Sequence, residues 1–297
     1  MLCASMPRRT HAHKNIKTAR REKMTRFKKA ICNDAFENRE IADIFQYVGD
    51  LGYDGVELNP YTLCETLDGL SLAERVCIRK AAESVGIEIV GIHSILKGPK
   101  GFFHINHPDA AVRADTLKHL NALITLCGDL GGKVIPLGAS KQRKVLPGLT
   151  HQQAWDYAVE VFEGVLETAE KCGVVLCLEP LSYRLTDFIT KASEAVRMVE
   201  EINHPNFKMM LDVRSASDDE MPIPELIRRS ANYLAHFHAN DDNGRGPGAG
   251  NADYEGISVA LKEIGYKGYL SVEVFDFQPD PETIAIESLN TLRKYFD

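Results

Sequence analysis

The feature that most constrains the fold of this chain is a repeat of eight units, each an apolar, β-rich run followed by a segment with helical periodicity. Gly, Asn or Asp residues separate these segments, as they do where strands and helices end. The apolar residues run almost continuously through each strand, which is typical of parallel strands buried beneath helices. The predicted strands are 27–33, 54–60, 87–95, 133–139, 174–181, 207–213, 234–240 and 269–275.

Eight strand–helix units in about 270 residues predict a single (β/α)8 TIM barrel with its active site at the C-terminal ends of the strands. The competing fold, an open doubly wound sheet, calls for a Gly-rich phosphate loop after the first strand, and "CNDAFENRE" is not one. Five helices are expected to end at glycines, namely Gly52, Gly86, Gly131, Gly173 and Gly265. The predicted helices are 38–51, 71–85, 108–130, 151–172, 190–202, 222–231, 256–265 and 281–295.

Charge divides the chain into two unequal parts. Residues 1–29 hold ten Lys/Arg and one acid, Glu22, so the remaining residues carry −16 within a net charge of −7. We interpret residues 1–24 as a flexible basic extension, with a targeting segment or a nucleic-acid arm as alternatives, and residues 25–297 as the barrel domain. The acidic body argues against nucleic acid as the main partner.

Cysteine usage and hydropathy bear on location. The seven cysteines form no CxxC pair, and most lie in apolar periodic segments, which indicates reduced thiols in a cytoplasmic protein. No run approaches 18 apolar residues, so no membrane partner is predicted.

Four polar residues stand at the ends of the last four predicted strands. They are Glu179, Asp212, His238 and Glu273, and their separations of 33, 26 and 35 residues each correspond to about one strand–helix unit. Burying a lone carboxylate in an apolar strand is costly. Four separately bonded structural residues are the alternative, but the common register favours side chains that converge on one rim of the barrel.

Three carboxylates and one imidazole make an oxygen-rich metal site. Such a donor set favours Mn2+ most, with Mg2+ or Co2+ next, while Zn2+ or Ni2+ can occupy it by raw affinity. No cysteine is expected among the ligands.

The motifs "CLEP", "MMLDV", "HFHANDDNGRGPGAG" and "LSVEVFD" resemble the xylose-isomerase-like TIM-barrel superfamily, and most nearly its sugar phosphate isomerase/epimerase members, over about residues 26–296. The resemblance implies that Glu179, Asp212, His238 and Glu273 are the metal ligands. It also implies that Glu179 and Glu273 are the catalytic acid and base on opposite faces of the substrate. The sequence departs from the family at Ser215, where many epimerases have a substrate-contacting His, and Arg214 stands beside it.

Further residues near predicted strand ends are candidates for binding substrate. His93 resembles a substrate-binding histidine of the family, with a structural histidine as the alternative. His236 is expected to face the helix layer, and a charged surface loop is the alternative for the segment 138–144. The full set of substrate-binding candidates is Glu57, His93, Gln142, Arg143, Arg214 and Arg245.

The predicted chemistry follows from the ligand set. A divalent ion acidifies the carbon between a ketone and a hydroxyl, and a carboxylate on each face can remove and return a proton through an ene-diolate. We therefore expect a metal-dependent isomerase or epimerase of a sugar or sugar phosphate, and a homo-oligomer, dimeric or tetrameric. A keto-sugar or cyclitol lyase or dehydratase is the first alternative. An endonuclease IV-like repair enzyme and a non-catalytic sugar-binding protein are others.

Overall fold

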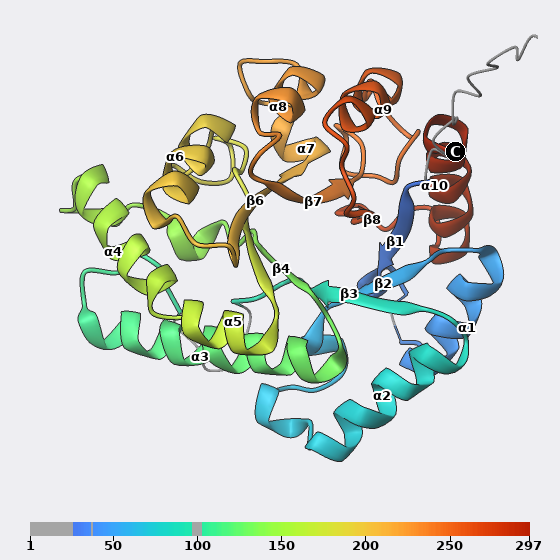
Figure 1. The fold of residues 1–297 in the computed structure, drawn as a ribbon, viewed down its shortest axis with the longest axis horizontal. Coiled ribbons are helices and arrows are strands. Elements are labelled where there is room, and N and C mark those ends of the chain that lie inside the picture. The colour runs from blue at the N-terminus through green and yellow to red at the C-terminus, as the bar shows by residue number, and fades with distance from the viewer. Residues whose placement is uncertain (1–25, 37, 97–102) are drawn as a thin grey trace, which may run out of the picture.

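The computed structural model describes residues 26–36, 38–96 and 103–297 of the chain (Figure 1). The predicted basic extension, residues 1–24, lies outside the described residues.

Eight parallel strands form a closed barrel in which each strand pairs with its sequence neighbours and β8 pairs with β1. This confirms the predicted (β/α)8 barrel, and Figure 1 shows the strands at its centre with the helices around them. The strands are β1 (Lys28–Cys32), β2 (Gly55–Leu58), β3 (Glu88–Ile92), β4 (Val134–Leu137), β5 (Val175–Leu178), β6 (Phe207–Asp212), β7 (Leu234–Ala239) and β8 (Tyr269–Val272).

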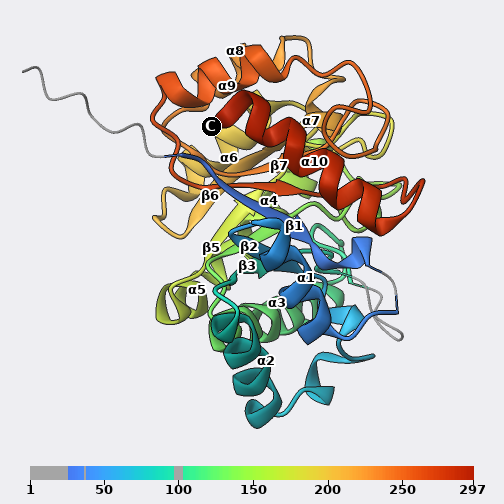
Figure 2. The same ribbon diagram turned by 90° about the vertical axis from the view of Figure 1, so that its right-hand side faces the viewer.

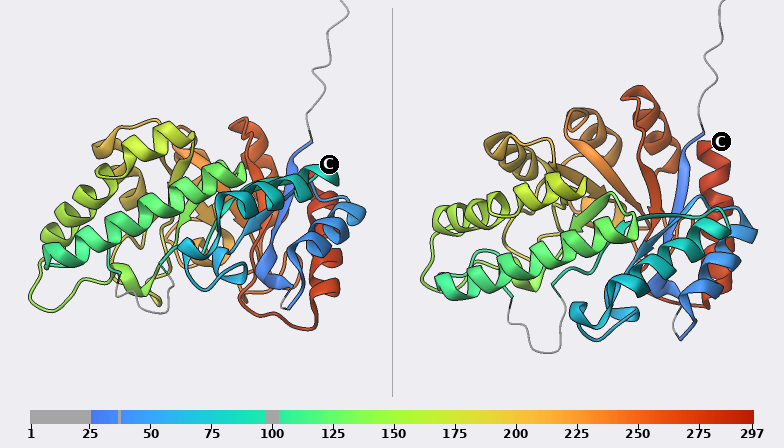
Figure 3. Two further views of the ribbon diagram at one scale, coloured as in Figure 1. Left: turned by 90° about the horizontal axis from the view of Figure 1, so that it is seen from below. Right: turned by 60° about the horizontal axis from the view of Figure 1, so that its bottom comes forward.

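The helices surround the barrel in the other views as well (Figures 2 and 3). Within the described residues, none of them is both long and apolar enough to cross a membrane. The α-helices are α1 (Ile41–Leu51), α2 (Leu72–Ser84), α3 (Ala110–Leu130), α4 (His151–Glu163), α5 (Leu166–Cys172), α6 (Ala192–Ile202), α7 (Val213–Ala216), α8 (Ile223–Arg229), α9 (Tyr254–Glu263) and α10 (Pro281–Phe296). Short 3-10 helices span Asn33–Ala35, Pro60–Thr62, Leu67–Gly69 and Lys141–Arg143.

Local sequence explains where the helices end. The five glycines expected at helix C-termini all adopt positive φ, the conformation that glycine reaches without steric cost. The single helix expected over 151–172 is instead divided into α4 and α5 near Gly164. A Cβ on Gly164 would lie 2.3 Å from Leu117 Cδ1, so the glycine permits close packing against α3.

The short helix α7 was not predicted, and it begins directly at a strand-end carboxylate. Asp212 ends β6, and its Oδ1 accepts a 2.7 Å hydrogen bond from the backbone N–H of Ser215. An aspartate in this N-cap position satisfies a donor that the helix leaves free. One side chain thus ends a strand, starts a helix and stays at the rim of the barrel.

Candidate metal and active site

A cavity of about 460 Å³ opens at the C-terminal ends of the strands. This is the end of the barrel at which enzymes of this fold carry their active sites. Its lining includes His93, Gln142, Glu179, Arg214, His238 and Glu273.

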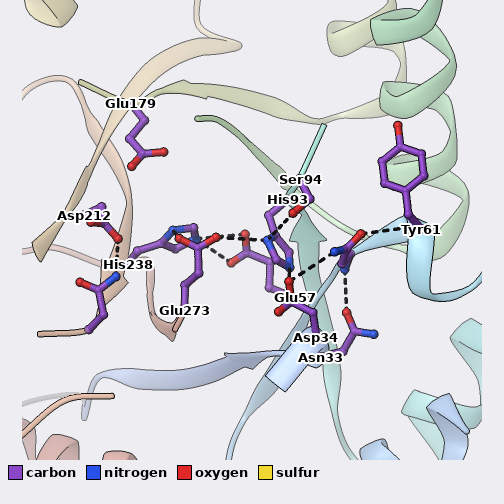
Figure 4. Close-up of polar contacts among 12 residues, drawn as sticks. Asn33, Asp34, Glu57, Tyr61, His93, Ser94, Glu179, Asp212, His238 and Glu273 are labelled. Carbon is purple, nitrogen blue, oxygen red and sulfur yellow. Dashed lines mark hydrogen bonds and ion pairs between the residues drawn. The ribbon is translucent and has the colours of Figure 1, made fainter. Parts of the chain in front are cut away.

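Three of the four predicted ligands converge in this region. Asp212, His238 and Glu273 each offer one ligand atom, and these atoms lie within 4.8 Å of one another. The pairing of β6 with β7 explains part of this geometry, because it sets Asp212 directly beside His238. Glu179 lies outside this group of three but lines the same cavity, and Figure 4 shows its carboxylate pointing toward them.

Crowding of negative charge gives Glu179 an unusual environment. Burial and the neighbouring carboxylates of Asp212 and Glu273 raise its pKa to about 8. The pKa of Asp212 is raised too, first by burial and then by Glu273. Ser215 Oγ donates to Glu179 Oε1 at 3.2 Å, and Asn240 donates to Asp212 Oδ2 at 2.5 Å. These neutral donors do not cancel the repulsion, which a cation would relieve.

Glu273 differs from Glu179 because histidines flank it. His238 Nδ1 lies 3.0 Å from Glu273 Oε2, and His93 Nδ1 lies 3.2 Å from Oε1. Burial alone would raise the pKa of Glu273, but the two histidines outweigh burial and hold it below its ordinary value. Glu273 is therefore held in its ionised form.

His93 lies between two carboxylates. Its Nε2 is 3.7 Å from Asp34 Oδ2, on the side away from Glu273. Burial alone would lower the pKa of His93, but Asp34 and Glu273 raise it to about 9. Asp34 was not among the residues predicted from the sequence, although it follows the first predicted strand, in "CNDAF", as the other site residues follow or end theirs.

Glu57 does not reach the cavity, so its predicted contact with substrate is wrong. Its side chain is fully buried, and its carboxylate contacts two histidine nitrogens. His236 Nε2 lies 2.9 Å from Oε2, and His238 Nε2 lies 3.1 Å from Oε1. Burial opposes the ionisation of Glu57, yet the two histidines hold its pKa well below the ordinary value.

The expectation that His236 faces the helices is also wrong. Residues two apart on a strand point to the same face, so His236 lies on the same side of β7 as His238. Both are buried, and their ring centroids are 5.0 Å apart. His236 is absent from the groups that could hold a metal within the described residues, and it contacts Glu57 instead.

The Glu57 contact leaves one nitrogen of His238 for a ligand. A carboxylate accepts hydrogen bonds, so Glu57 keeps a proton on His238 Nε2, and Nδ1, which faces Glu273, is the nitrogen that can give up its proton to bind a cation. Nδ1 is buried and has no hydrogen-bond partner within the described part of the chain, although it is close to Glu273. An imidazole nitrogen with ligand spacing to the carboxylates of Asp212 and Glu273 suits a divalent cation.

Cys32 lies nearer this cluster than expected. It joins Glu57 and His238 in one group with metal-ligand spacing, and His93 and Glu273 in another. Burial and then the charge of Glu57 raise the pKa of the Cys32 thiol well above its ordinary value. The thiolate is the form that ligates a metal, so without a cation Cys32 is held in its non-ligating form.

Arg143 is not placed to bind substrate, contrary to prediction. It is buried, and its guanidinium donates to three backbone carbonyls, those of Leu137, Ala139 and Glu179. It therefore joins the ends of β4 and β5. Its neighbour Gln142 does line the cavity and donates to the carbonyl of Leu96 at 3.3 Å.

The two remaining arginine candidates lie differently. Arg245 is outside the cavity lining and forms an exposed ion pair with Asp276 at 2.8 Å, so the structure does not bring it together with the other predicted substrate-binding residues. Arg214 lines the cavity, and its guanidinium lies over the Phe275 ring, 4.6 Å from the centroid.

The fold and the cavity define a (β/α)8 protein with a carboxylate- and histidine-rich centre at the strand C-termini. Comparison with known families gives the narrower assignment. Residues 45–295 match the family described as xylose isomerase-like TIM barrel, and the protein belongs to that family.

Similar proteins include several sugar epimerases. The chain is 30% identical over 231 residues to D-psicose 3-epimerase of Agrobacterium fabrum, which covers 77% of each chain. It is 23% identical to 3-dehydro-D-guloside 4-epimerase of Escherichia coli, over 88% of this chain and 97% of that protein. The crystal structure of D-psicose 3-epimerase with D-tagatose from Clostridium cellulolyticum superposes with a TM-score of 0.80 at 24% identity, covering 91% of this chain and 99% of that one.

Proposed function

We propose that this protein is a divalent-metal-dependent epimerase or isomerase of keto-sugars. The observation that carries the proposal is the convergence of Asp212, His238 and Glu273 within 4.8 Å, in a cavity that Glu179 also lines. Relatives named D-psicose 3-epimerase and 3-dehydro-D-guloside 4-epimerase support a keto-sugar as the substrate class.

Glu179, Asp212, His238 and Glu273 would hold the metal, with Mn2+ the ion that this donor set favours. A bound divalent cation would acidify the carbon next to the ketone of the substrate and neutralise charge that develops on oxygen. The raised pKa of Glu179 supports this assignment, because its charged form is costly without a cation nearby.

The chain itself would move the protons. One glutamate, Glu179 or Glu273, takes the proton from carbon and leaves the ene-diolate of the substrate. The other returns a proton to the opposite face, which inverts that carbon. His93, 3.2 Å from Glu273, would hold that carboxylate in position during both steps.

A lyase or dehydratase remains the second candidate, because the same ene-diolate can expel a neighbouring leaving group. The substitution of Ser215 for the histidine that many epimerases carry favours keeping this candidate. Ser215 Oγ donates a hydrogen bond to the Glu179 carboxylate at 3.2 Å, whereas a histidine at this position in the epimerases contacts the substrate.

The test is solvent-deuterium incorporation. The protein, loaded with Mn2+, is incubated in D2O with a panel of ketoses, keto-sugars and their phosphates, and the products are followed by NMR. Deuterium at one carbon together with an inverted or isomerised product is the expected result, whereas deuterium with a dehydrated product identifies a lyase. No incorporation into any substrate with Mn2+, Mg2+ or Co2+ would overturn the proposal.

Two further properties stay predictions. A cytoplasmic location can be checked by fractionation, and a dimeric or tetrameric assembly can be checked by size-exclusion chromatography with light scattering.

A further inference from the structure

We propose that the substrate carries an anionic group, a phosphate or a carboxylate, and that Arg214 binds it. This inference rests on the proposed function, because it specifies the substrate class of the same cavity. It stands on the position of Arg214, on the residues that hold its guanidinium, and on the charges that surround the cavity.

Arg214 lies close in the chain to the proposed metal ligands and has no acidic partner among the residues that the structure describes. It follows the ligand Asp212 by two residues, and its backbone N–H donates to Asn240 Oδ1 at 2.8 Å, which fixes the start of α7. Among the described residues no carboxylate forms an ion pair with Arg214, whereas Arg184 pairs with Asp218. Its charge is therefore free to meet a ligand in the cavity that it lines.

Phe275 holds the guanidinium in place. This ring is 45% exposed and follows Glu273 by two residues, so it stands at the cavity rim. The guanidinium carbon lies 4.6 Å from the ring centroid. Stacking of this kind occupies the face of the guanidinium and leaves its N–H groups on the edge to donate.

The glycine-rich loop after β7 packs against this pair. Gly244 has φ +81°, and a Cβ at this position would lie 3.4 Å from Arg214 Nε and 3.5 Å from Phe275 Cβ. Its carbonyl accepts the backbone N–H groups of Phe275 at 2.8 Å and Asp276 at 3.0 Å. The loop thus supports Arg214 and Phe275 together, and a guanidinium held in this way loses little side-chain entropy on binding an anion.

The charges around the cavity agree with an anionic substrate. Lys141 also lines it and has no ion-pair partner among the described residues. With a divalent cation bound, the three ligand carboxylates leave one net negative charge, and Arg214 and Lys141 more than balance it. A neutral sugar would leave Arg214 without a charged partner, whereas a phosphate or carboxylate would supply one.

The test compares three ketohexoses that differ in the group at carbon 6, namely D-fructose, D-fructose 6-phosphate and D-fructuronate. Binding to the Mn2+-loaded protein is measured by calorimetry, and deuterium exchange is measured on the same samples. The variant is Arg214→Met, which keeps an unbranched chain against Phe275 but removes the charge. The matched control is Arg197→Met, because Arg197 stacks on Trp155 at 4.2 Å and is not part of the cavity lining.

We expect at least one anionic ketose to bind the native protein about 10- to 100-fold more tightly than D-fructose, the range for a hydrogen-bonded charge pair. Arg214→Met should lose that preference, because its affinity for the anionic ketose falls far more than its affinity for D-fructose while Mn2+ still binds, and Arg197→Met should behave as the native protein. A preference for the phosphate or for the carboxylate identifies the source of the charge.

Equal binding of all three sugars, no binding of either anion, or an equal loss for all three in Arg214→Met would overturn the anion site. A different result would overturn the proposed function and leave the anion site standing: binding of anions through Arg214 without deuterium exchange in any sugar. Exchange in D-fructose without a preference for anions would leave the function standing and remove only this inference.

Discussion

Glu57 and Glu179 are the same residue type in the same barrel, exposed by only 0% and 4%, yet their surroundings act in opposite directions. Burial works against the ionisation of both. Around Glu57 two histidines overcome it, and the pKa falls well below the ordinary value. Around Glu179 two carboxylates add to it, and the pKa rises to about 8.

The difference shows that burial alone does not decide the state of a carboxylate. The negative charge of Glu57 is balanced by His236 and His238, so this carboxylate can hold His238 in place without a ligand. On the Glu179 side the surrounding described residues leave the pKa of this carboxyl raised, and a bound cation would favour its charged form. We interpret the first as the support for His238 and the second as the place where binding and chemistry occur.

The largest expected effect comes from removing one of the two glutamate carboxylates that line the cavity, on the Glu179 side of the site. Glu179→Gln and Glu273→Gln keep an oxygen donor and the side-chain volume but lose the base. Turnover should fall by about 10²-fold or more, the usual scale for a positioned general base. Metal should still bind, although more weakly, because one of three negative charges is gone. Product formation and deuterium exchange at saturating Mn2+ are the measurements.

The two variants also separate the mechanisms. If two opposed bases act, one variant should still exchange the acidic proton of the substrate with solvent while it fails to form product. In a lyase, which needs proton removal on one face only, one of the two replacements should cost mainly metal affinity. Near-native turnover in both would leave the four residues as a metal cage without a role in proton transfer.

A smaller effect is expected when the support side is changed. Glu57→Gln places an amide N–H2 opposite one of two histidine nitrogens that both need an acceptor, so one imidazole must change its tautomer. If His238 changes, Nδ1 carries a proton and no longer offers a lone pair. We expect Mn2+ affinity to fall about 10- to 100-fold, the range for changes behind a metal ligand.

Titration calorimetry with Mn2+ measures this affinity, and the visible absorption of the Co2+ form reports ligand geometry. Glu88→Gln is the control, because Glu88 is an exposed strand glutamate that pairs with Lys28 at 2.6 Å. Unchanged metal affinity and an unchanged Co2+ spectrum in Glu57→Gln would show that Glu57 does not position His238.

Strand-end residues could be predicted from the sequence because barrel closure decides where they lie. Once eight parallel strands are inferred, their carboxyl ends must meet at one rim, and Asp212, His238 and Glu273 follow. The direction of His236 was also within reach, since side chains two apart on a strand share a face.

Loop side chains could not be predicted in the same way. Gln142 and Arg143 are neighbours in one 3-10 helix, yet one lines the cavity and the other turns inward to backbone carbonyls. Arg245 pairs with Asp276, which lies 31 residues further along the chain. Such partners depend on the conformation of each loop, and no period in the sequence encodes it. The contact of Glu57 with both histidines was hidden for a related reason, since β2 and β7 are not adjacent in the barrel.

The smallest expected effect is a pH dependence of stability and Mn2+ affinity near neutral pH, which Glu179 should produce and Glu57 should not. Because the pKa of Glu179 is higher in the folded protein than its unfolded value near 4.5, the folded state binds the extra proton. The free energy of unfolding of the metal-free protein should therefore fall as pH rises from about 4.5 toward 8. The raised pKa of His93, about 9, acts in the same direction above pH 6.5. Glu57, with a lowered pKa, contributes no change in this window, because its stabilisation is lost only below about pH 4.5.

Mn2+ must displace the proton of Glu179, so the affinity for Mn2+ should rise between pH 6 and 8 by at most about tenfold per pH unit for that proton. The measurement is the melting temperature at pH 6, 7 and 8 with and without Mn2+, repeated in Glu179→Gln, which should keep only the share due to the other groups. An identical Mn2+-dependent pH profile in the native protein and in Glu179→Gln would contradict the difference between Glu57 and Glu179, because it would show that Glu179 does not titrate in this pH range.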